Sequence, residues 1–508
     1  MRLTICQETA LKELIAWSKT SATSWTLAGA GGTGKSTLML EAVKQMSGRA
    51  GTIVSAPTHK AKLVISQMTG YESSTIQGLI GLSPDMDIEN FDINNPIFRP
   101  KNEPKIGYYK KVIIDEGSML PDTLFDYLLT LAQKAGTKLL FLGDKFQIPP
   151  VGEHSSKIFD EREVDGISVL STLVRQSPTS PLPMLLTALR WDIAYHCGWD
   201  YSIERNSLQT IMRSFRLTTV IEECDAKIGN IFKFLLSLYP ALSNPDTGEG
   251  YKLYRDLEIV HQLAVDKFKE LIDTKNVSLA KYIAFSNGDV AKANTKFRNA
   301  LFNNPADTLV KGDFIMAYKT IQKGRDNVLL TNSQEYIIDK ITQWNKLDPN
   351  SNAVKGYEID IQQVGSFFTT EGLFVVSPDS YKEFIALHEH YHKLGRDERK
   401  WQNYYAFKEN YLLLHSLRLM YEKEQLPDGV RTVNNKNLPM KDVDYAYGIT
   451  THKSQGSTYD NTFVNLKDIS MILRIKDETT TADDKRIFFL KLVYTALSRT
   501  KTFANIYS

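Results

Sequence analysis

The sequence predicts an α/β protein whose sheets are mostly parallel. Short apolar runs alternate with helical segments over residues 1–155, and several of these runs end in polar loops. A glycine-rich turn at residues 29–34 follows the first run and opens a helix. A second alternation starts near Ile167 and resumes at residues 282–285. Strands that alternate with helices favour a parallel sheet with helices on both faces.

The elements of the first half follow in order from this pattern. A helix is expected from about Lys35 to Met46, and strands are expected at residues 25–28, 51–56, 112–114 and 139–142. Residues 84–104 interrupt the pattern with four helix-breaking prolines: Pro84, Pro96, Pro100 and Pro104. We therefore expect an inserted hairpin on an exposed loop there. In parallel sheets, ligands bind at the carboxyl ends of the strands.

The second half predicts another α/β domain that carries an insertion. Residues 180–275 have a mostly helical pattern, whereas residues 308–376 are rich in short β-like runs that suggest a small barrel. Residues 379–424 are helical in pattern but crowded with Tyr, Lys, His and Glu, and we expect them to be too polar to bury a full face. The chain is expected to return to strands near Tyr445 and Val493 and to end just after a strand.

Length and composition limit the class of protein. A chain of 508 residues predicts two to four domains, and 42% hydrophobic with 24% charged residues excludes a disordered or fibrous protein. No run approaches the roughly 18 apolar residues of a membrane span, and the N-terminus lacks a signal peptide's apolar core. The cysteines are too scattered for a zinc site or disulfide framework, which favours a reducing, cytoplasmic setting: Cys6, Cys197 and Cys224. The net charge of +2 neither requires nor excludes a polyanionic partner.

A phosphate-binding motif stands at residues 29–36, where GAGGTGKS matches G-x-x-x-x-G-K-[ST] between a predicted strand and a predicted helix. The glycines allow backbone N–H groups to wrap phosphate oxygens. Lys35 would reach the β- and γ-phosphates, and the Ser36 hydroxyl would bind Mg²⁺. The predicted nucleotide-binding residues of this segment are Gly29, Gly31, Gly32, Thr33, Gly34, Lys35, Ser36 and Thr37. A glycine-rich turn without a ligand is the alternative.

A pair of carboxylates, Asp115 and Glu116, ends the buried run at residues 112–114. Like charges repel at a buried strand end, so a structural role for the pair is hard to justify. Asp115 can hold Mg²⁺, and Glu116 can polarise the attacking water. Together with the P-loop, the pair predicts nucleotide hydrolysis.

The ordered set of motifs resembles the superfamily 1B DNA helicases of the Dda/RecD type, with the greatest similarity to bacteriophage Dda helicases. After Gln7 and the P-loop, the matching segments are APTHKA (56–61), STI (74–76), DEGSM (115–119), GDKFQIPP (143–150), residues 170–176, AFSN (284–287), THKSQGS (451–457) and YTALSR (494–499). The family often has T-I-H where this chain has Thr75, Ile76 and Gln77.

The resemblance implies two RecA-like domains that bind ATP between them. Domain 1A would comprise residues 1–83 and 105–168, and domain 2A residues 169–305 and 440–508. Residues 84–104 would form the pin hairpin. Domain 2B (306–439) would hold an SH3-like barrel (306–377) and a helical tower (378–425).

The resemblance also assigns roles around the nucleotide. It implies that Gln7 reads the adenine edge and that Gln147 senses the γ-phosphate. Arg175 and Arg499 would be arginine fingers, for which a surface salt bridge is the default alternative. Gln455 and Gly456 would couple the second domain to the γ-phosphate.

The remaining implied residues face the nucleic acid. Single-stranded DNA and its junctions with duplex would be bound without sequence preference by Pro57, Thr58, His59, Thr75, Asn287, His452 and Lys453. Phe98, or Phe91, is the candidate wedge that splits the duplex, and the rival role for Phe98 is to anchor the hairpin onto its own domain. Single-strand-binding or replication proteins are further candidate partners of a monomeric, cytoplasmic enzyme.

One motif points elsewhere. Residues 388–392 fit H-E-x-x-H, the zinc-protease pattern, but no third ligand has a suitable spacing. A solvated or DNA-facing histidine cluster is the preferred interpretation. For the whole chain, a 5′-to-3′ ATP-dependent DNA helicase is the first hypothesis. The alternatives are a DNA-stimulated translocase that displaces bound proteins with little unwinding, and a single-strand clamp without turnover.

Overall fold

In the computed structural model, the described residues are 3–46, 51–57, 62, 65–66, 69–82, 102–150, 152–172, 180–217, 220–274, 276–305, 307–323, 327–347, 353–414, 441–475 and 480–508. The chain divides into two compact units. Unit 1 comprises residues 1–260, 283–286 and 450–508, and unit 2 comprises residues 261–282 and 287–449. Within the described residues, no helix is long and apolar enough to cross a membrane.

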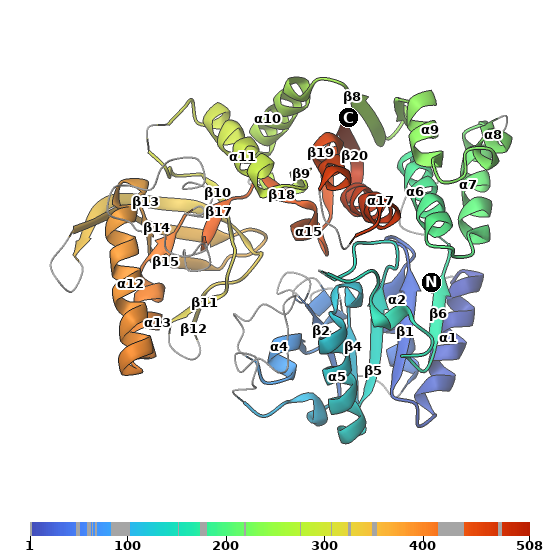
Figure 1. The fold of residues 1–508 in the computed structure, drawn as a ribbon, viewed down its shortest axis with the longest axis horizontal. Coiled ribbons are helices and arrows are strands. Elements are labelled where there is room, and N and C mark those ends of the chain that lie inside the picture. The colour runs from blue at the N-terminus through green and yellow to red at the C-terminus, as the bar shows by residue number, and fades with distance from the viewer. Residues whose placement is uncertain are drawn as a thin grey trace. The chain divides into compact units, whose positions relative to one another are not determined.

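The first sheet of unit 1 is parallel throughout. Its strands lie in the order β3 (Ser73–Thr75), β2 (Thr52–Ala56), β4 (Lys111–Ile114), β5 (Lys138–Gly143), β1 (Ser24–Gly29) and β6 (Ile167–Leu170). Figure 1 shows the run from β2 to β6. The four strands expected at 25–28, 51–56, 112–114 and 139–142 are confirmed. Strand β6 pairs with β1 and carries this sheet to Leu170, so the sheet extends two residues past residue 168, where the predicted domain 1A ends.

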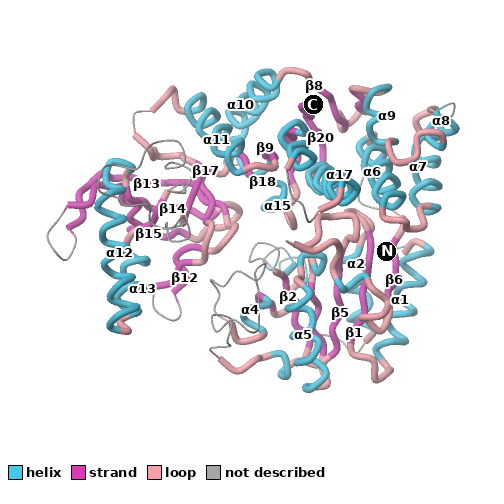
Figure 2. The backbone as a smooth tube through the Cα atoms, viewed as in Figure 1, coloured by secondary structure: helices cyan, strands magenta, loops and turns pink. Residues whose placement is uncertain are grey.

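Helices cover both faces of this sheet (Figure 2). One face packs on α1 (Ile5–Ser18) and α2 (Lys35–Gln45) through a core that includes Val54, Ile113 and Leu140. The other face packs on α5 (Asp122–Ala135) through Ile53, Val112 and Leu139. Neighbouring residues of one strand point to opposite faces, so strands buried on both faces are apolar at every position. The unbroken apolar runs of the sequence are explained in this way.

A helical segment follows the first sheet in unit 1. It consists of α6 (Leu182–His196), α7 (Ser202–Ser214), α8 (Ile221–Asp225) and α9 (Ile231–Leu238), followed by the hairpin of β7 (Ala241–Ser243) and β8 (Gly250–Tyr254). Helix α10 (Leu257–Asp273) comes next in the chain and enters unit 2 at His261. The mostly helical stretch expected at 180–275 is confirmed. Buried Asp192 on α6 accepts the N–H groups of Ile231 and Phe232 at 2.9 Å each. These are two of the backbone N–H groups at the start of α9 that have no hydrogen-bond partner within the helix.

The second sheet has the order β18 (Gly448–Thr450), β9 (Ala280–Ala284), β19 (Tyr459–Asn465), β20 (Thr500–Tyr507), β8 and β7. In it, β20 pairs parallel with β19 and β8, whereas β7 pairs antiparallel with β8. Short elements follow β18 and β19: α15 (Thr451–Ser454), α16 (Leu466–Ile469) and the 3₁₀ segment η9 (Ser470–Arg474). The strand expected near Val493 is wrong, because residues there belong to helix α17 (Ala482–Ser498). A capping box between Thr481 and Asp484 starts this helix.

Unit 2 contains a mostly antiparallel sheet in the order β16 (Leu412–Leu413), β15 (Thr369–Val376), β14 (Ala353–Gln363), β13 (Glu335–Leu347), β10 (Phe314–Ala317) and β17 (Val443–Tyr445). Helix α11 (Asn287–Leu301) precedes this sheet in the chain. After β10, the strands β11 (Ile321–Lys323) and β12 (Asn327–Leu330) form a separate antiparallel ribbon. The β-rich insertion expected at 308–376 is confirmed. Two buried ion pairs hold unit 2 together: Lys281 with Glu335 at 3.0 Å and Arg298 with Asp313 at 2.9 Å.

The helical insertion of unit 2 packs more tightly than its composition suggested. Helices α12 (Tyr381–Glu398) and α13 (Trp401–Asn410) share a buried cluster that includes Phe384, Leu387 and Phe407, so the expectation that this segment cannot bury a face is wrong. His388 lies in that core and contacts the Tyr404 hydroxyl at 3.0 Å through Nε2. It is therefore not the solvated histidine that the sequence favoured, and no metal-binding group of His, Cys, Asp or Glu occurs among the described residues.

Burial of His388 predicts acid sensitivity of this helical pair. Burial lowers the pKa of His388 from 6.5 to about 4, and Lys408, His392 and Lys319 lower it further against the opposing charge of Asp442. Because the folded state disfavours the protonated ring, the unfolded state binds the proton more readily. The stabilisation is thus complete above pH 6.5 and is lost as the pH falls toward 4.

Denaturant unfolding between pH 7 and pH 4 measures this effect. We expect the pH dependence to flatten in His388→Gln, which keeps an acceptor for Tyr404 but does not titrate. The exposed neighbour His390 is the matched control, and His390→Gln should retain the full dependence. Equal slopes for the two variants would contradict the assignment to His388.

Candidate nucleotide-binding site

The P-loop joins β1 to α2, and its conformation depends on glycine at two positions. Gly32 and Gly34 have φ of 84° and 82°, in the left-handed region that side chains disfavour. A Cβ on Gly29 would lie 2.6 Å from Thr33 Oγ1, so this position also excludes a side chain. Gly34 is the N-cap of α2, which begins at Lys35. The loop thus presents backbone N–H groups at a helix N-terminus, the arrangement that binds phosphate.

The Lys35 ammonium is held by its own loop. Lys35 Nζ donates to the carbonyl oxygens of Gly29 at 2.6 Å and Ala30 at 3.2 Å. These oxygens occupy the places around the ammonium that phosphate oxygens would take. The ammonium has three N–H donors, so a nucleotide can bind the remaining one and gains further charge-assisted bonds, the stronger kind, where phosphate oxygens replace the carbonyls.

Gln7, the candidate adenine reader, lies on α1 and is 6% exposed. Its amide nitrogen donates to the Thr33 carbonyl at 3.0 Å, and its amide oxygen accepts the Thr4 N–H at 2.9 Å. Both ends of the amide are therefore bound to backbone groups, one of them in the P-loop. Its predicted contact with adenine stays a prediction, and that contact requires at least one of these bonds to open.

The carboxylate pair ends β4 as predicted. Asp115 Oδ1 accepts the Glu116 N–H at 3.0 Å, and Glu116 has a left-handed backbone with φ of 52°. Burial and the neighbouring Glu116 charge raise the pKa of Asp115 to about 6, and the Lys35 charge opposes that shift. The nearby Lys35 charge does not offset burial and the Glu116 charge, and a divalent cation would supply further positive charge. This donor chemistry fits Mg²⁺, with Asp115 and the Ser36 hydroxyl as the residues that would hold it.

Asp144, at the end of β5, connects the P-loop to the second half of unit 1. Its Oδ2 accepts the Gly31 N–H at 3.1 Å and the Tyr494 hydroxyl at 2.8 Å, and its Oδ1 accepts the Phe146 N–H at 3.1 Å. The side chain is 1% exposed. One carboxylate thereby links three segments: the nucleotide loop, the β5 loop and helix α17.

The β5 loop, residues 144–150, is bound from two further directions. Ile148 donates its N–H to Thr495 Oγ1 on α17 at 3.2 Å, and its carbonyl accepts the Gln455 amide at 3.3 Å. Gln147 is 4% exposed, and its amide oxygen has no hydrogen-bond partner among the described residues. Gln455 is thus placed against the loop that carries Gln147, and Gly456 follows it with φ of 70°. The roles of these residues toward a γ-phosphate stay predictions.

Of the two candidate arginine fingers, only Arg499 lies among the described residues. Arg499 follows α17 and is 6% exposed; its guanidinium donates to the carbonyls of Thr495 at 3.2 Å and Ser457 at 3.3 Å. Arg175 lies outside the described residues. Arg499 stands four residues beyond Thr495, the residue that binds the β5 loop, but these hydrogen bonds join it to residues 457 and 495 and not to the P-loop.

The candidate nucleic-acid residues are scattered over several elements. Thr75 caps the short helix α4 (Ile76–Leu79) and accepts the Gly78 N–H at 3.2 Å, which commits its hydroxyl to the backbone. Pro57 follows β2, and Asn287 is exposed at the start of α11. His452, on α15, contacts the ring of Phe285, and burial lowers its pKa. Lys453 follows it on α15. Thr58, His59, Phe91 and Phe98 lie outside the described residues.

Sequence reasoning missed Asp468, which organises the loop after β9. It accepts the N–H groups of Phe285 and Ser286 at 2.7 Å each and the Ser286 hydroxyl at 2.8 Å. The partners are more than 180 residues apart in the chain, so no local pattern indicates the contact. The Asp144 bond to Tyr494 was missed for the same reason, although both residues lie in segments that the motifs had singled out.

The Asp144–Tyr494 bond yields a stability prediction. Tyr494→Phe removes the hydroxyl donor to a buried carboxylate, and we expect it to lower the free energy of unfolding by about 1.5–3 kcal/mol. Tyr251 is a matched control, because its hydroxyl is also buried but has no partner among the described residues. Tyr251→Phe should be neutral or stabilising. Denaturant unfolding of both variants measures the difference, and equal losses would contradict the importance of the Asp144 contact.

The fold and the site define a P-loop nucleotide-binding protein whose P-loop follows a strand of a parallel sheet. Residues 2–190 match the family described as AAA domain. The ATP-dependent DNA helicase dda of Enterobacteria phage T4 is 35% identical over 137 residues, 26% of this chain and 30% of that protein. The ATP-dependent RecD2 DNA helicase of Deinococcus radiodurans is 36% identical over 127 residues, 25% of this chain and 16% of that protein. These matches confirm the resemblance to superfamily 1B helicases of the Dda/RecD type.

The extent of these similarities is limited. The matched segments span only 30% and 16% of the lengths of the two helicases. An uncharacterised protein of Acanthamoeba polyphaga mimivirus matches over a longer stretch, with 24% identity over 82% of each chain. A solved structure of Pif1 helicase from Bacteroides, in complex with ADP-AlF3 and ssDNA, aligns over 99% of this chain with 15% identity and a TM-score of 0.42.

Proposed function

We propose that this chain is an ATP-dependent DNA helicase that moves 5′-to-3′ along single-stranded DNA. The main support is the β5 loop of unit 1. Through Asp144 and Ile148, this loop is bonded to the P-loop on one side and to Tyr494, Thr495 and Gln455 on the other. A change at the terminal phosphate would therefore act through the β5 loop on α17 and Gln455, which belong to the half of unit 1 that contains β19 and β20.

The proposed cycle uses the residues of this chain as follows. Lys35 and the P-loop N–H groups bind the β- and γ-phosphates, while Glu116 orients the attacking water. Mg²⁺, held by Ser36 and Asp115, supplies charge stabilisation when bound. Gln147 and Arg499 contact the terminal phosphate, so its loss removes a ligand shared by the two sheets. The sheets then separate, and the grip on the strand advances.

Contacts with DNA are proposed at the ends of strands. Pro57 with Thr58 and His59, Thr75, Asn287, His452 and Lys453 would bind the strand through hydroxyl, amide and basic groups, a mode that does not depend on base sequence. Phe98 is the proposed wedge. Breaking a base-pair step costs on average about 1.4 kcal/mol of stacking, and a rigid aromatic side chain lowers that barrier by capping the last pair.

Strand displacement tests the proposal and its direction together. Duplexes with a 5′ or a 3′ single-stranded tail are compared with and without ATP. The proposal requires ATP-dependent displacement from the 5′ tail, whereas displacement from the 3′ tail alone would reverse the proposed direction and keep the motor. ATP hydrolysis stimulated by DNA but without displacement from either tail would instead favour a translocase.

A further inference from the structure

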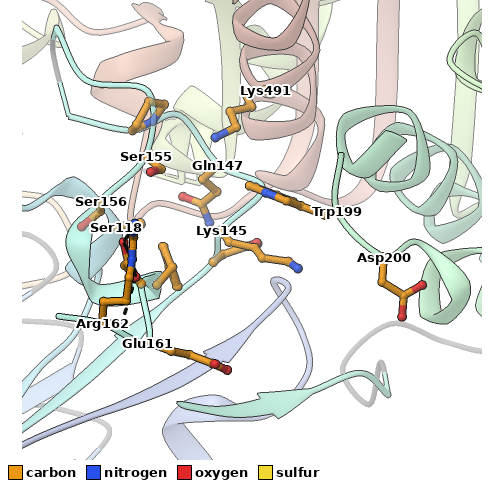
Figure 3. A pocket seen from close by; sticks show the side chains of 14 residues that line it. Ser118, Lys145, Gln147, Ser155, Ser156, Glu161, Arg162, Trp199, Asp200 and Lys491 are labelled. Atoms are coloured by element: carbon orange, nitrogen blue, oxygen red, sulfur yellow. Dashed lines mark hydrogen bonds and ion pairs between the residues drawn. The ribbon is translucent and has the colours of Figure 1, made fainter. Parts of the chain in front are cut away.

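A cavity of about 600 Å³ lies beside the β5 loop, entirely within unit 1. Its walls come from the β5 loop, from the 3₁₀ turn η4 (Gly117–Met119), from residues 155–162, from the turn after α6 and from α17 (Figure 3). Asp144 and Gln147 belong both to this wall and to the candidate nucleotide site. The cavity therefore adjoins the place where a terminal phosphate would be cleaved.

The inner wall carries a buried ammonium, that of Lys491. This side chain is 2% exposed and reaches from α17 toward the loop of Gln147 (Figure 3). Among the described residues it makes one hydrogen bond, to the His154 carbonyl at the long distance of 3.4 Å, and its Nζ lies 5.5 Å from the centre of the Trp199 ring. Burial lowers the pKa of Lys491, as expected for a charge that water does not reach.

The carboxylates around the cavity are committed elsewhere or lie at its edge. Asp144 is bound to Gly31, Phe146 and Tyr494. Asp160 pairs with Arg162 at 2.6 Å, and Asp200 accepts the N–H and hydroxyl of Ser202 at 2.9 Å each. Glu161 is exposed. A buried ammonium without a paired carboxylate is costly, and an anion in the cavity would compensate it.

Two further polar groups on the same wall are unsatisfied among the described residues. The Ser118 hydroxyl and the Gln147 amide oxygen are buried without a hydrogen-bond partner. The Ser118 hydroxyl and the Lys491 ammonium supply donors for the oxygens of a tetrahedral anion, and the Gln147 amide oxygen can accept the hydroxyl of hydrogen phosphate. Lys145, whose Nζ lies 4.7 Å from the centre of the Trp199 ring, also lines the cavity and adds a second positive charge.

We propose that this cavity is a second anion site, which receives the inorganic phosphate released by hydrolysis. Lys491 and the Ser118 hydroxyl donate to its oxygens, and the Gln147 amide oxygen accepts its hydroxyl. The source of the phosphate rests on the proposed function, since ATP hydrolysis would produce it. The phosphate group of a DNA strand shares the same chemistry. The cavity's position behind Asp144 and Gln147, next to the cleavage point, favours the free ion.

Titration of inorganic phosphate into the full-length chain tests the site without turnover or DNA. The P-loop is disabled by Lys35→Ala, so that binding there does not contribute. In that background we expect calorimetry to detect phosphate binding, and Lys491→Met to weaken it by at least about tenfold, the cost of losing a charged hydrogen-bond donor. Lys485→Met, on the same helix but outside the cavity wall, is the matched control and should leave binding unchanged.

The other outcomes overturn the proposal. Absence of phosphate binding in the Lys35→Ala background, or binding that is insensitive to Lys491→Met, would show that the cavity is not an anion site. Displacement of phosphate by single-stranded DNA would assign the site to the strand. Ser118→Ala, which removes one donor and no charge, should weaken binding severalfold and gives an independent reading if Lys491→Met does not fold. Because none of these titrations involves hydrolysis, they stand even if the proposed helicase activity fails.

Discussion

Lys35→Ala is expected to reduce the rate of ATP hydrolysis by at least about a hundredfold while single-stranded DNA binding persists. The reduction follows from loss of the only ammonium in the P-loop, and removal of one preorganised donor of this kind typically costs about 10²–10³ in kcat. The DNA contacts are proposed on other loops, so they should survive. Steady-state hydrolysis and fluorescence anisotropy of a labelled oligonucleotide measure the two quantities.

Lys44→Ala is the matched control for this prediction. Lys44 lies on the same helix, α2, but its side chain is 66% exposed and pairs with Glu41 at 3.8 Å. Its removal should change neither hydrolysis nor DNA binding. A thermal melt of Lys35→Ala is also needed, because Lys35 satisfies two loop carbonyls and their release costs some stability. Hydrolysis that persists in folded Lys35→Ala would contradict the assignment of the site.

The parts of the fold that local patterns encode could be predicted from the sequence. The strands at β1, β2, β4 and β5 were predictable because a strand buried on both faces must be apolar at every position. The P-loop was predictable because phosphate binding demands glycines, a lysine and a hydroxyl in one short segment. In each case the physical requirement acts within a few residues.

Two predictions, the strand near Val493 and the exposure of His388, were wrong because the local sequence pattern fits more than one structure. The run around Val493 is apolar and β-branched enough to suggest a strand, but a buried helix shows the same apolar content. The capping box of Thr481 and Asp484 was the signal that could have identified α17. His388 was judged exposed because polar residues surround it in the sequence, yet Phe384 and Leu387 place one face of α12 in a core.

The contacts that organise the candidate site could not be predicted, since they join distant segments. Asp144 and Tyr494 are 350 residues apart, and Ile148 and Thr495 are 347 apart. Both bonds connect motif segments whose order was evident from the sequence, but only the fold shows that they meet. The cavity beside Lys491 could not be predicted for the same reason, because its wall combines residues of α17 with residues of the β5 loop.

Arg499→Ala is expected to lower kcat for ATP hydrolysis by about 10³–10⁵, the range typical of an arginine that stabilises transition-state charge. The structure places Arg499 four residues after Thr495, which binds the β5 loop, and the contact of its guanidinium with a terminal phosphate is the proposed role that this variant tests. Truncation also leaves the buried carbonyls of Thr495 and Ser457 without this donor. A loss of stability of about 1–3 kcal/mol must therefore be separated from the catalytic effect.

Arg486→Ala separates the two effects. Arg486 lies on the same helix and also binds backbone and amide oxygens, those of Gly229 at 3.0 Å and Asn230 at 2.6 Å, but it has no proposed role at the nucleotide. Rates measured well below the melting temperatures of both variants should show a large loss of kcat for Arg499→Ala alone. Arg499→Lys should recover little, because an ammonium lacks the planar fork of donors. If both alanine variants lose stability equally and keep kcat, Arg499 has a structural role and the transition-state charge is stabilised by another group.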